Sequence, residues 1–225
     1  MIVGLYGAGS AFVSCAFADR LQSPAARVVL PPAKEGGKSE DVATVHQVDD
    51  ATLLVVGLKA IPADRAFAFT RLLYQHLPAP EETLILHSLG RHEFHSSSDA
   101  YSSSTFRLLE TRASRQKRES SQTKPPCAYL EVPNMVEGAA AAIVSHLERR
   151  GQVGRLMVSV LGEEPGGRLG LEAVQGFAEV LNTSGGGDSL LALTDAQRAQ
   201  AASAYPAAVK AFNARLSLPK TSIFL

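Results

Sequence analysis

Residues 127–151 read CAYLEVPNMVEGAAAAIVSHLERRG, and this stretch decides the fold. Residues 128–132 alternate and are rich in strand formers, and Pro133, which has no N–H to donate, predicts the end of that strand. Asn134 then stands where a helix needs an N-cap, because its side-chain oxygen can accept an unpaired backbone N–H. Glu137, three residues later, would complete a capping box. The stretch therefore predicts a strand followed at once by a helix capped by Asn134.

The predicted helix includes an alanine run at residues 139–142, which favours helix and takes little room. Ile143, Val144 and Leu147 form an apolar stripe, and Gly151 predicts the end of the helix. A buried strand that feeds a closely packed helix is the repeating unit of an α/β fold.

Composition narrows the classes of partner. The chain has 225 residues, of which 45% are hydrophobic and 20% charged, and its formal net charge is zero. We therefore expect no nucleic-acid partner and no membrane partner. No run approaches the roughly 18 apolar residues of a membrane span. The two cysteines, Cys15 and Cys127, predict a reducing compartment: the cytoplasm, with the nucleus as a second location.

Strand and helix patterns alternate along most of the chain. We predict strands at residues 1–5, 28–30, 42–48, 52–58, 82–87, 155–161 and 190–193. We predict helices at residues 10–21, 62–77, 171–181 and 194–216, the last with a break at Pro206. The alternation predicts a single α/β domain, residues 1–217, with a mainly parallel sheet and helices on both faces. The first strand starts at Met1, which suggests that a preceding segment is missing.

Residues 96–126 differ from the rest in being dense in Ser, Thr, Lys and Arg. This composition predicts a long, flexible polar loop. We expect a short amphipathic turn at residues 106–109 and disorder at residues 112–124.

The turn from Gly7 to Ser10 is the nearest approach to a catalytic signature. A strand, Gly-x-Gly and a helix can seat a pyrophosphate on the helix N-terminus. Phe12, however, replaces the third glycine of that fingerprint and would crowd the approach of helix to strand, and no acidic residue ends the second strand. The residues favour a structural turn; a small α/β enzyme that binds a nucleotide or nucleoside here is the alternative.

Other catalytic or metal-binding patterns are weak. His92 and His95 flank Glu93, but metal sites need more ligands on firmer support. No nucleophile elbow, P-loop or Cys-x-x-Cys pair occurs. We therefore expect no catalytic residue, no cofactor and no metal.

The chain ends Ile223-Phe224-Leu225 after Pro219, in a predicted tail of residues 218–225. Large apolar side chains can each contribute about 1.5–3 kcal/mol when buried, and a terminal carboxylate can be captured by a lysine or a backbone nest. The tail either folds back on its own domain or binds a partner. The residues alone favour the first.

The chain resembles the proteasome assembly chaperone 1 family. The strongest match is Tyr129-Leu130-Glu131-Val132-Pro133-Asn134-Met135-Val136, which is similar to the family's Leu-Glu-x-Pro-Asn-Ile/Val-Val segment before a helix. Ile2-Val3-Gly4 with Ala11-Phe12-Val13-Ser14 resembles the first strand and helix of the family, and Leu171-Glu172-Ala173-Val174 with Phe177 resembles a later helix. Ile223, Phe224 and Leu225 stand where the family ends in a hydrophobic–Tyr–X motif.

The resemblance implies a non-enzymatic chaperone for assembly of the proteasome core particle. It implies a heterodimer with proteasome assembly chaperone 2 that binds α subunits of the core particle. Ile223, Phe224 and Leu225 would then enter a pocket between adjacent α subunits, where a lysine meets the carboxylate. Phe224 departs from the family's Tyr, so a contact through its hydroxyl is lost. The N-terminal extension of animal members has no counterpart in this sequence.

Overall fold

The computed structural model describes residues 1–32, 37–90, 93–95, 106–164, 168–183 and 194–216. Its strands are β1 (Ile2–Gly4), β2 (Ala26–Leu30), β3 (Glu40–Gln47), β4 (Leu53–Gly57), β5 (Glu82–Gly90), β6 (Phe106–Glu110), β7 (Ala128–Tyr129), β8 (Val153–Glu164) and β9 (Arg168–Leu169). Its helices are α1 (Ala8–Ala16), α2 (Ala66–His76), α3 (Arg112–Ser120), α4 (Gly138–Arg149), α5 (Leu171–Thr183) and α6 (Asp195–Leu216), with short 3-10 turns η1 (Ala18–Arg20) and η2 (Ala63–Arg65).

All strands join one sheet in the order β2-β3-β4-β1-β5-β8-β6-β7, and β9 pairs with β8. The central strands β4, β1, β5 and β8 run parallel to one another. On either side of them, β3 is antiparallel to β4 and β6 is antiparallel to β8. The predicted mainly parallel sheet is therefore confirmed in its centre.

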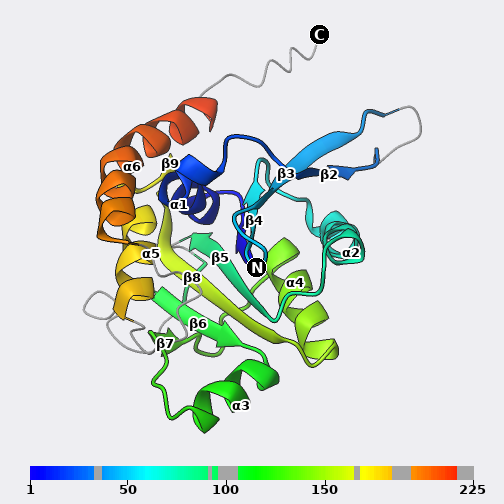
Figure 1. Ribbon diagram of the computed structural model, residues 1–225, viewed down its shortest axis with the longest axis vertical. Coiled ribbons are helices and arrows are strands. Elements are labelled where there is room, and N and C mark those ends of the chain that lie inside the picture. Colours follow the sequence, from blue (N-terminus) through cyan, green and yellow to red (C-terminus); the bar gives the residue numbers. More distant parts are fainter. Residues whose placement is uncertain (33–36, 91–92, 96–105, 165–167, 184–193, 217–225) are drawn as a thin grey trace.

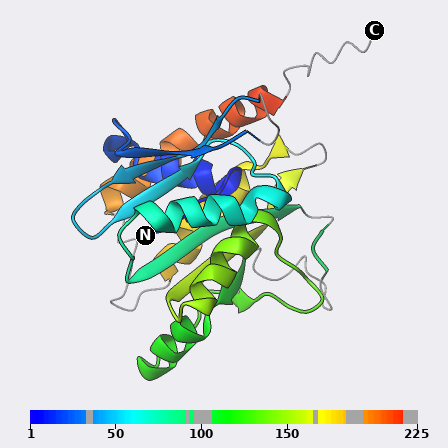
Figure 2. The same ribbon diagram turned by 90° about the vertical axis from the view of Figure 1, so that its right-hand side faces the viewer.

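Helices cover both faces of this sheet (Figure 1). α1, α5 and α6 form one core with the sheet, and α2 and α4 form the other. Figure 2 shows α2 and α4 in front of the sheet and α6 behind it. The predicted single α/β domain is confirmed by these two layers of helices around one sheet.

The contact of α1 with the sheet is unusually close. A Cβ added at Gly9 would lie 2.2 Å from the carbonyl oxygen of Leu86 in β5, and one at Gly4 would lie 2.5 Å from the carbonyl oxygen of Gly9. Phe12 does not crowd this approach, contrary to expectation. It packs against Phe177 of α5 at a ring distance of 5.7 Å.

The predicted start of α4 is wrong. The helix begins at Gly138, and its N-cap is Glu137, whose side chain makes no capping hydrogen bond. The predicted strand before it shortens to β7. Asn134 does not cap the helix, because its side chain bonds the backbone of His95 and Glu131 instead. Gly151 does follow the end of the helix, with φ of 64°, as predicted.

The expected loop at residues 96–126 is wrong over residues 106–120, whereas residues 121–126 form neither helix nor strand. Residues 106–109 belong to strand β6, which pairs with β8, and residues 112–120 form α3. Thr111 caps α3, because its side chain accepts a hydrogen bond from the backbone N–H of Ser114. Residues 96–105 lie outside the described part of the chain.

Most other predicted elements are confirmed with small shifts in their ends. These are β1 to β5, β8, α1, α2, α5 and α6. α6 contains Pro206 without the predicted break. The strand predicted at residues 190–193 lies outside the described residues.

Glu110 ties α3 and β7 to the sheet, and its side chain is fully buried. Arg118 Nη2 donates to its carboxylate at 2.9 Å and the Tyr129 hydroxyl donates at 2.5 Å, while Arg115 lies 3.6 Å away. Burial by itself would raise the pKa of Glu110. Hydrogen bonds from Arg118 and Tyr129, together with the nearby charges, outweigh that effect and hold the pKa below its usual value.

We expect Gly9→Ala to destabilise the protein by about 1–3 kcal/mol, because the new methyl group collides with the β5 backbone. The sign is diagnostic, since Gly→Ala inside a helix normally stabilises by about 1 kcal/mol. Urea unfolding measures the change, and Ser14→Ala in the same helix is the control. A Gly9→Ala protein as stable as the parent would contradict the close approach.

Glu110→Gln should lower the free energy of unfolding at pH 7 by about 3 kcal/mol, because it leaves Arg118 without its buried partner. The folded pKa of Glu110 is depressed, so its contribution is present above the ordinary glutamate pKa of about 4.3 and is lost as pH falls through the folded pKa. The gap between parent and variant should therefore close in acid.

Glu119→Gln is the matched control, because Glu119 Oε1 lies 3.9 Å from the same Arg118 Nη2 but is 62% exposed. Its effect should stay within about 0.5 kcal/mol. Equal losses for the two variants would show that burial of Glu110 does not matter.

Candidate functional site

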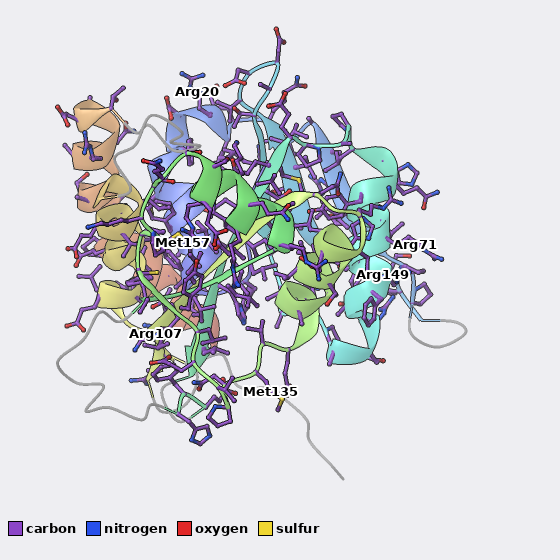
Figure 3. All side chains as sticks on the ribbon, turned by 90° about the horizontal axis from the view of Figure 1, so that it is seen from below. Arg20, Arg71, Arg107, Met135, Arg149 and Met157 are labelled. Carbon is purple, nitrogen blue, oxygen red and sulfur yellow. The ribbon has the colours of Figure 1, made fainter. Side chains whose placement is uncertain are left out.

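An exposed apolar loop lies between β7 and α4, at residues 130–137, here named the edge segment. Val132 is 93% exposed and Met135 is 73% exposed. Figure 3 shows Met135 at the periphery of the molecule, in contrast to Met157 in its interior. The Val132–Pro133 peptide bond is cis. Large apolar side chains held in water mark candidate interaction sites.

The edge segment is anchored by Arg107 of β6, which is only 2% exposed. Its Nε lies 2.9 Å from Glu131 Oε2, and its guanidinium lies 5.0 Å from the ring centre of Phe94. Burial alone would raise the pKa of Glu131, but the hydrogen bond from Arg107 and its charge lower it overall. A buried arginine is tolerated because these groups compensate its desolvation.

Asn134 ties the edge segment to the loop that follows β5. Its Nδ2 donates to the His95 carbonyl at 2.6 Å, and its Oδ1 accepts from the His95 backbone N–H at 2.6 Å. The same Nδ2 donates to the Glu131 carbonyl at 2.8 Å. The amide thus pairs with a backbone as a neighbouring strand would.

Together, Arg107 and Asn134 fix the backbone beneath Val132 and Met135. Binding a partner orders side chains and loops at a cost in free energy, and a surface already held in place avoids much of that cost. The arrangement suits protein recognition through apolar anchors. Among the described residues, no group of three or more His, Cys, Asp or Glu could hold a metal ion.

The turn at residues 7–10 is not arranged to hold a phosphate. Gly7 has φ of 110°, and Ser10 points inward, with its N–H on the Leu5 carbonyl at 2.8 Å and its Oγ on the Gly7 carbonyl at 3.1 Å. The amino end of α1 is buried against β5. A phosphate site needs exposed N–H groups at that end of a helix. The structure therefore does not favour the nucleotide alternative.

Some of the remaining sequence-based predictions concern residues that the structure does not describe, and others concern residues that it does. Ile223, Phe224 and Leu225, the predicted partner-binding residues, lie outside the described residues, as does His92. His95 takes part through its backbone rather than as a metal ligand. No described helix combines the length and the apolar character that crossing a bilayer requires.

Sequence reasoning missed Arg107, Phe94 and the role of His95. The available signal was an arginine inside the apolar run Phe106-Arg107-Leu108-Leu109. A charge in such a run indicates either a solvated face or a buried ion pair. Only the pairing of β6 with β8 and β7 decides between them.

Comparisons with known proteins found likeness in structure alone. No protein-family model matches the sequence. No curated protein matches it. A protein of unknown function from Thermoplasma acidophilum superimposes with a TM-score of 0.63 at 13% identity, over 95% of this chain and 85% of that chain.

Two further similar structures have more informative descriptions. PbaA from Pyrococcus furiosus, an archaeal homolog of proteasome-assembly chaperone, has a TM-score of 0.59 at 12% identity, over 94% of this chain and 91% of that one. A proteasome-assembly chaperone homologue from Mycobacterium tuberculosis has a TM-score of 0.54 at 12% identity, over 99% of this chain and 96% of that one. At such identities these likenesses establish a shared fold.

Proposed function

We propose that this protein is a non-enzymatic chaperone for assembly of the proteasome core particle. The observation that carries the proposal is the likeness in fold to PbaA and to the mycobacterial homologue over 94% and 99% of the chain. A fold alone hosts many functions, so the specific role must come from surfaces. We propose the edge segment and the C-terminal residues as two such surfaces. We also propose that the protein is cytoplasmic, with the nucleus as a second location.

The edge segment is the proposed contact with a second chaperone subunit, proteasome assembly chaperone 2. It is the part of the chain most similar to the assembly chaperone 1 family, and it exposes Val132 and Met135 on a fixed backbone. Exposed apolar surface of this kind marks candidate sites of protein–protein contact.

The C-terminal residues are the proposed contact with the α-ring. α6 ends at Leu216, and Phe212 near that end lies 4.9 Å from the ring of Tyr6, just beyond β1. α6 therefore ends near the carboxyl edge of the sheet. Ile223 and Phe224 would fill a groove between adjacent α subunits, with the Leu225 carboxylate on a lysine. Occupied grooves would also exclude regulatory particles from an unfinished core particle.

Deletion of Ile223, Phe224 and Leu225 should weaken binding to purified α-ring subunits at least about tenfold, because apolar burial and a charged contact are lost together. The heterodimer with assembly chaperone 2 should persist. Titration by biolayer interferometry measures the first, and size-exclusion chromatography measures the second.

Replacement of Thr221 and Ser222 by alanine keeps the tail's length and apolar end and serves as the control. Unchanged α-ring affinity after the deletion would remove the tail from the proposal. Loss of both interactions would indicate a damaged fold instead of a lost anchor.

Val132→Asp with Met135→Asp should reduce affinity for assembly chaperone 2 by at least about tenfold, because a charge enters an apolar contact. Phe67→Asp is the control, since Phe67 is another exposed apolar residue, 70% exposed on α2 and not part of the edge segment. Equal heterodimer affinities for the two proteins would exclude the edge segment as that interface.

A further inference from the structure

A cavity of about 300 Å³ opens at the carboxyl ends of β1, β4 and β5. Its walls are mostly apolar and include Val3, Val55, Phe69, Ala140 and Phe212. From β1 the chain passes through α1 to β2, which lies on the β4 side of the sheet. From β4 it passes through α2 to β5, on the opposite side of β1, so the direction of the connections reverses at β1. Ligands of open α/β sheets bind at the carboxyl ends of the strands beside such a reversal.

His87 brings an imidazole to the wall of this cavity. It lies on the face of β5 that also carries Ile85 and Leu89, both in the apolar core. Its Nδ1 is buried and has no hydrogen-bond partner among the described residues. Burial lowers the pKa of His87 to about 4, despite the charge of Glu93, so the imidazole is neutral at pH 7. An apolar residue would pack there without an unsatisfied polar atom.

The amino end of α4 brings backbone donors to the same cavity, which Glu137, Gly138 and Ala139 also line. The N-cap, Glu137, has an extended backbone and an exposed side chain that makes no capping hydrogen bond. The N–H groups of the first turn therefore have no acceptor within the helix and no side-chain cap. α4 is 12 residues long, so its positive dipole end also faces this region.

We propose that this cavity binds a small organic acid. Its carboxylate accepts hydrogen bonds from the first turn of α4 and from an imidazole N–H of His87, and its apolar body lies against Val3, Phe69 and Phe212. A neutral histidine supplies one such donor. The cavity is at the lower end of the size range of small-molecule sites, which suits a compact ligand.

Lys59 and Glu137 are the charged residues among the described residues that line the cavity. Lys59 is 56% exposed and lies 3.9 Å from Glu40 Oε2, a loose pair that leaves its ammonium free to turn toward an anion. Glu137 opposes an anion at the mouth, but its exposure lets water screen that repulsion. The site does not depend on the role proposed above, since the isolated chain contains all of it.

The test uses benzoate and hexanoate as probes, with benzyl alcohol and hexan-1-ol as neutral probes of matched apolar shape. Titration of ¹⁵N-labelled full-length protein should give saturable shifts of the Gly138, Ala139 and Ala140 amide signals with the acids. The alcohols should bind at least about tenfold more weakly, because they lack the charge that strengthens the hydrogen bonds. Equal affinities for acid and alcohol, or no saturable shift with either acid, would overturn the proposal.

His87→Leu should weaken binding of the acids by about tenfold to a hundredfold, the usual effect of losing a hydrogen bond to a charged group. Its melting temperature without ligand should equal or exceed that of the parent, because the unsatisfied imidazole is gone. His76→Leu, at an exposed position of α2, should leave binding unchanged. A large fall in melting temperature for His87→Leu would assign the histidine a structural role and overturn the proposal, as would unchanged affinity.

Discussion

The absence of side chains at Gly4 and Gly9 is the constraint on which the rest of the structure depends. Together they let α1 lie directly on the central strands, within the space that a single methyl group would fill. Phe12, buried on the same helix, packs against Phe177 and Tyr205, so that α5 and α6 pack on α1 as well as on the sheet. Glycines here make close packing possible, which explains why a fingerprint like that of dinucleotide-binding proteins need not hold a phosphate.

Local patterns were sufficient for the elements whose burial is continuous along the chain. β4 and β5 are apolar runs in the middle of a parallel sheet, and α2 has a clear apolar stripe. β6 and α3 were missed because their order comes from distant partners. The charges of residues 112–120 read as a solvated loop, yet Arg118 is held by Glu110 and Tyr129. A composition argument cannot see such a pairing.

The prediction for the start of α4 was wrong for a more specific reason. Asn134 can act as an N-cap, and a helix-forming sequence follows it. Its amide, however, makes more hydrogen bonds with the backbone of His95 and Glu131 than it would make as a cap. The helix then starts at Gly138 without a side-chain cap. A local signal was thus overridden by a contact across 39 residues, which leaves the first-turn N–H groups of α4 without a side-chain cap beside the cavity. The tail lies outside the described residues and stays a prediction from sequence.

Several features therefore converge on the carboxyl edge of the sheet: the cavity, the amino end of α4 and the end of α6. The loops that follow parallel strands lie at this edge, and their backbone groups are not paired within the sheet, so they can bind a ligand or partner. The edge segment itself shows how such a surface stays ordered. Arg107 is buried, and the cost of its desolvation offsets most of what its ion pair contributes to the stability of the fold. Arg107 instead holds the exposed apolar residues of the edge segment in one geometry, which the stability of the core does not require.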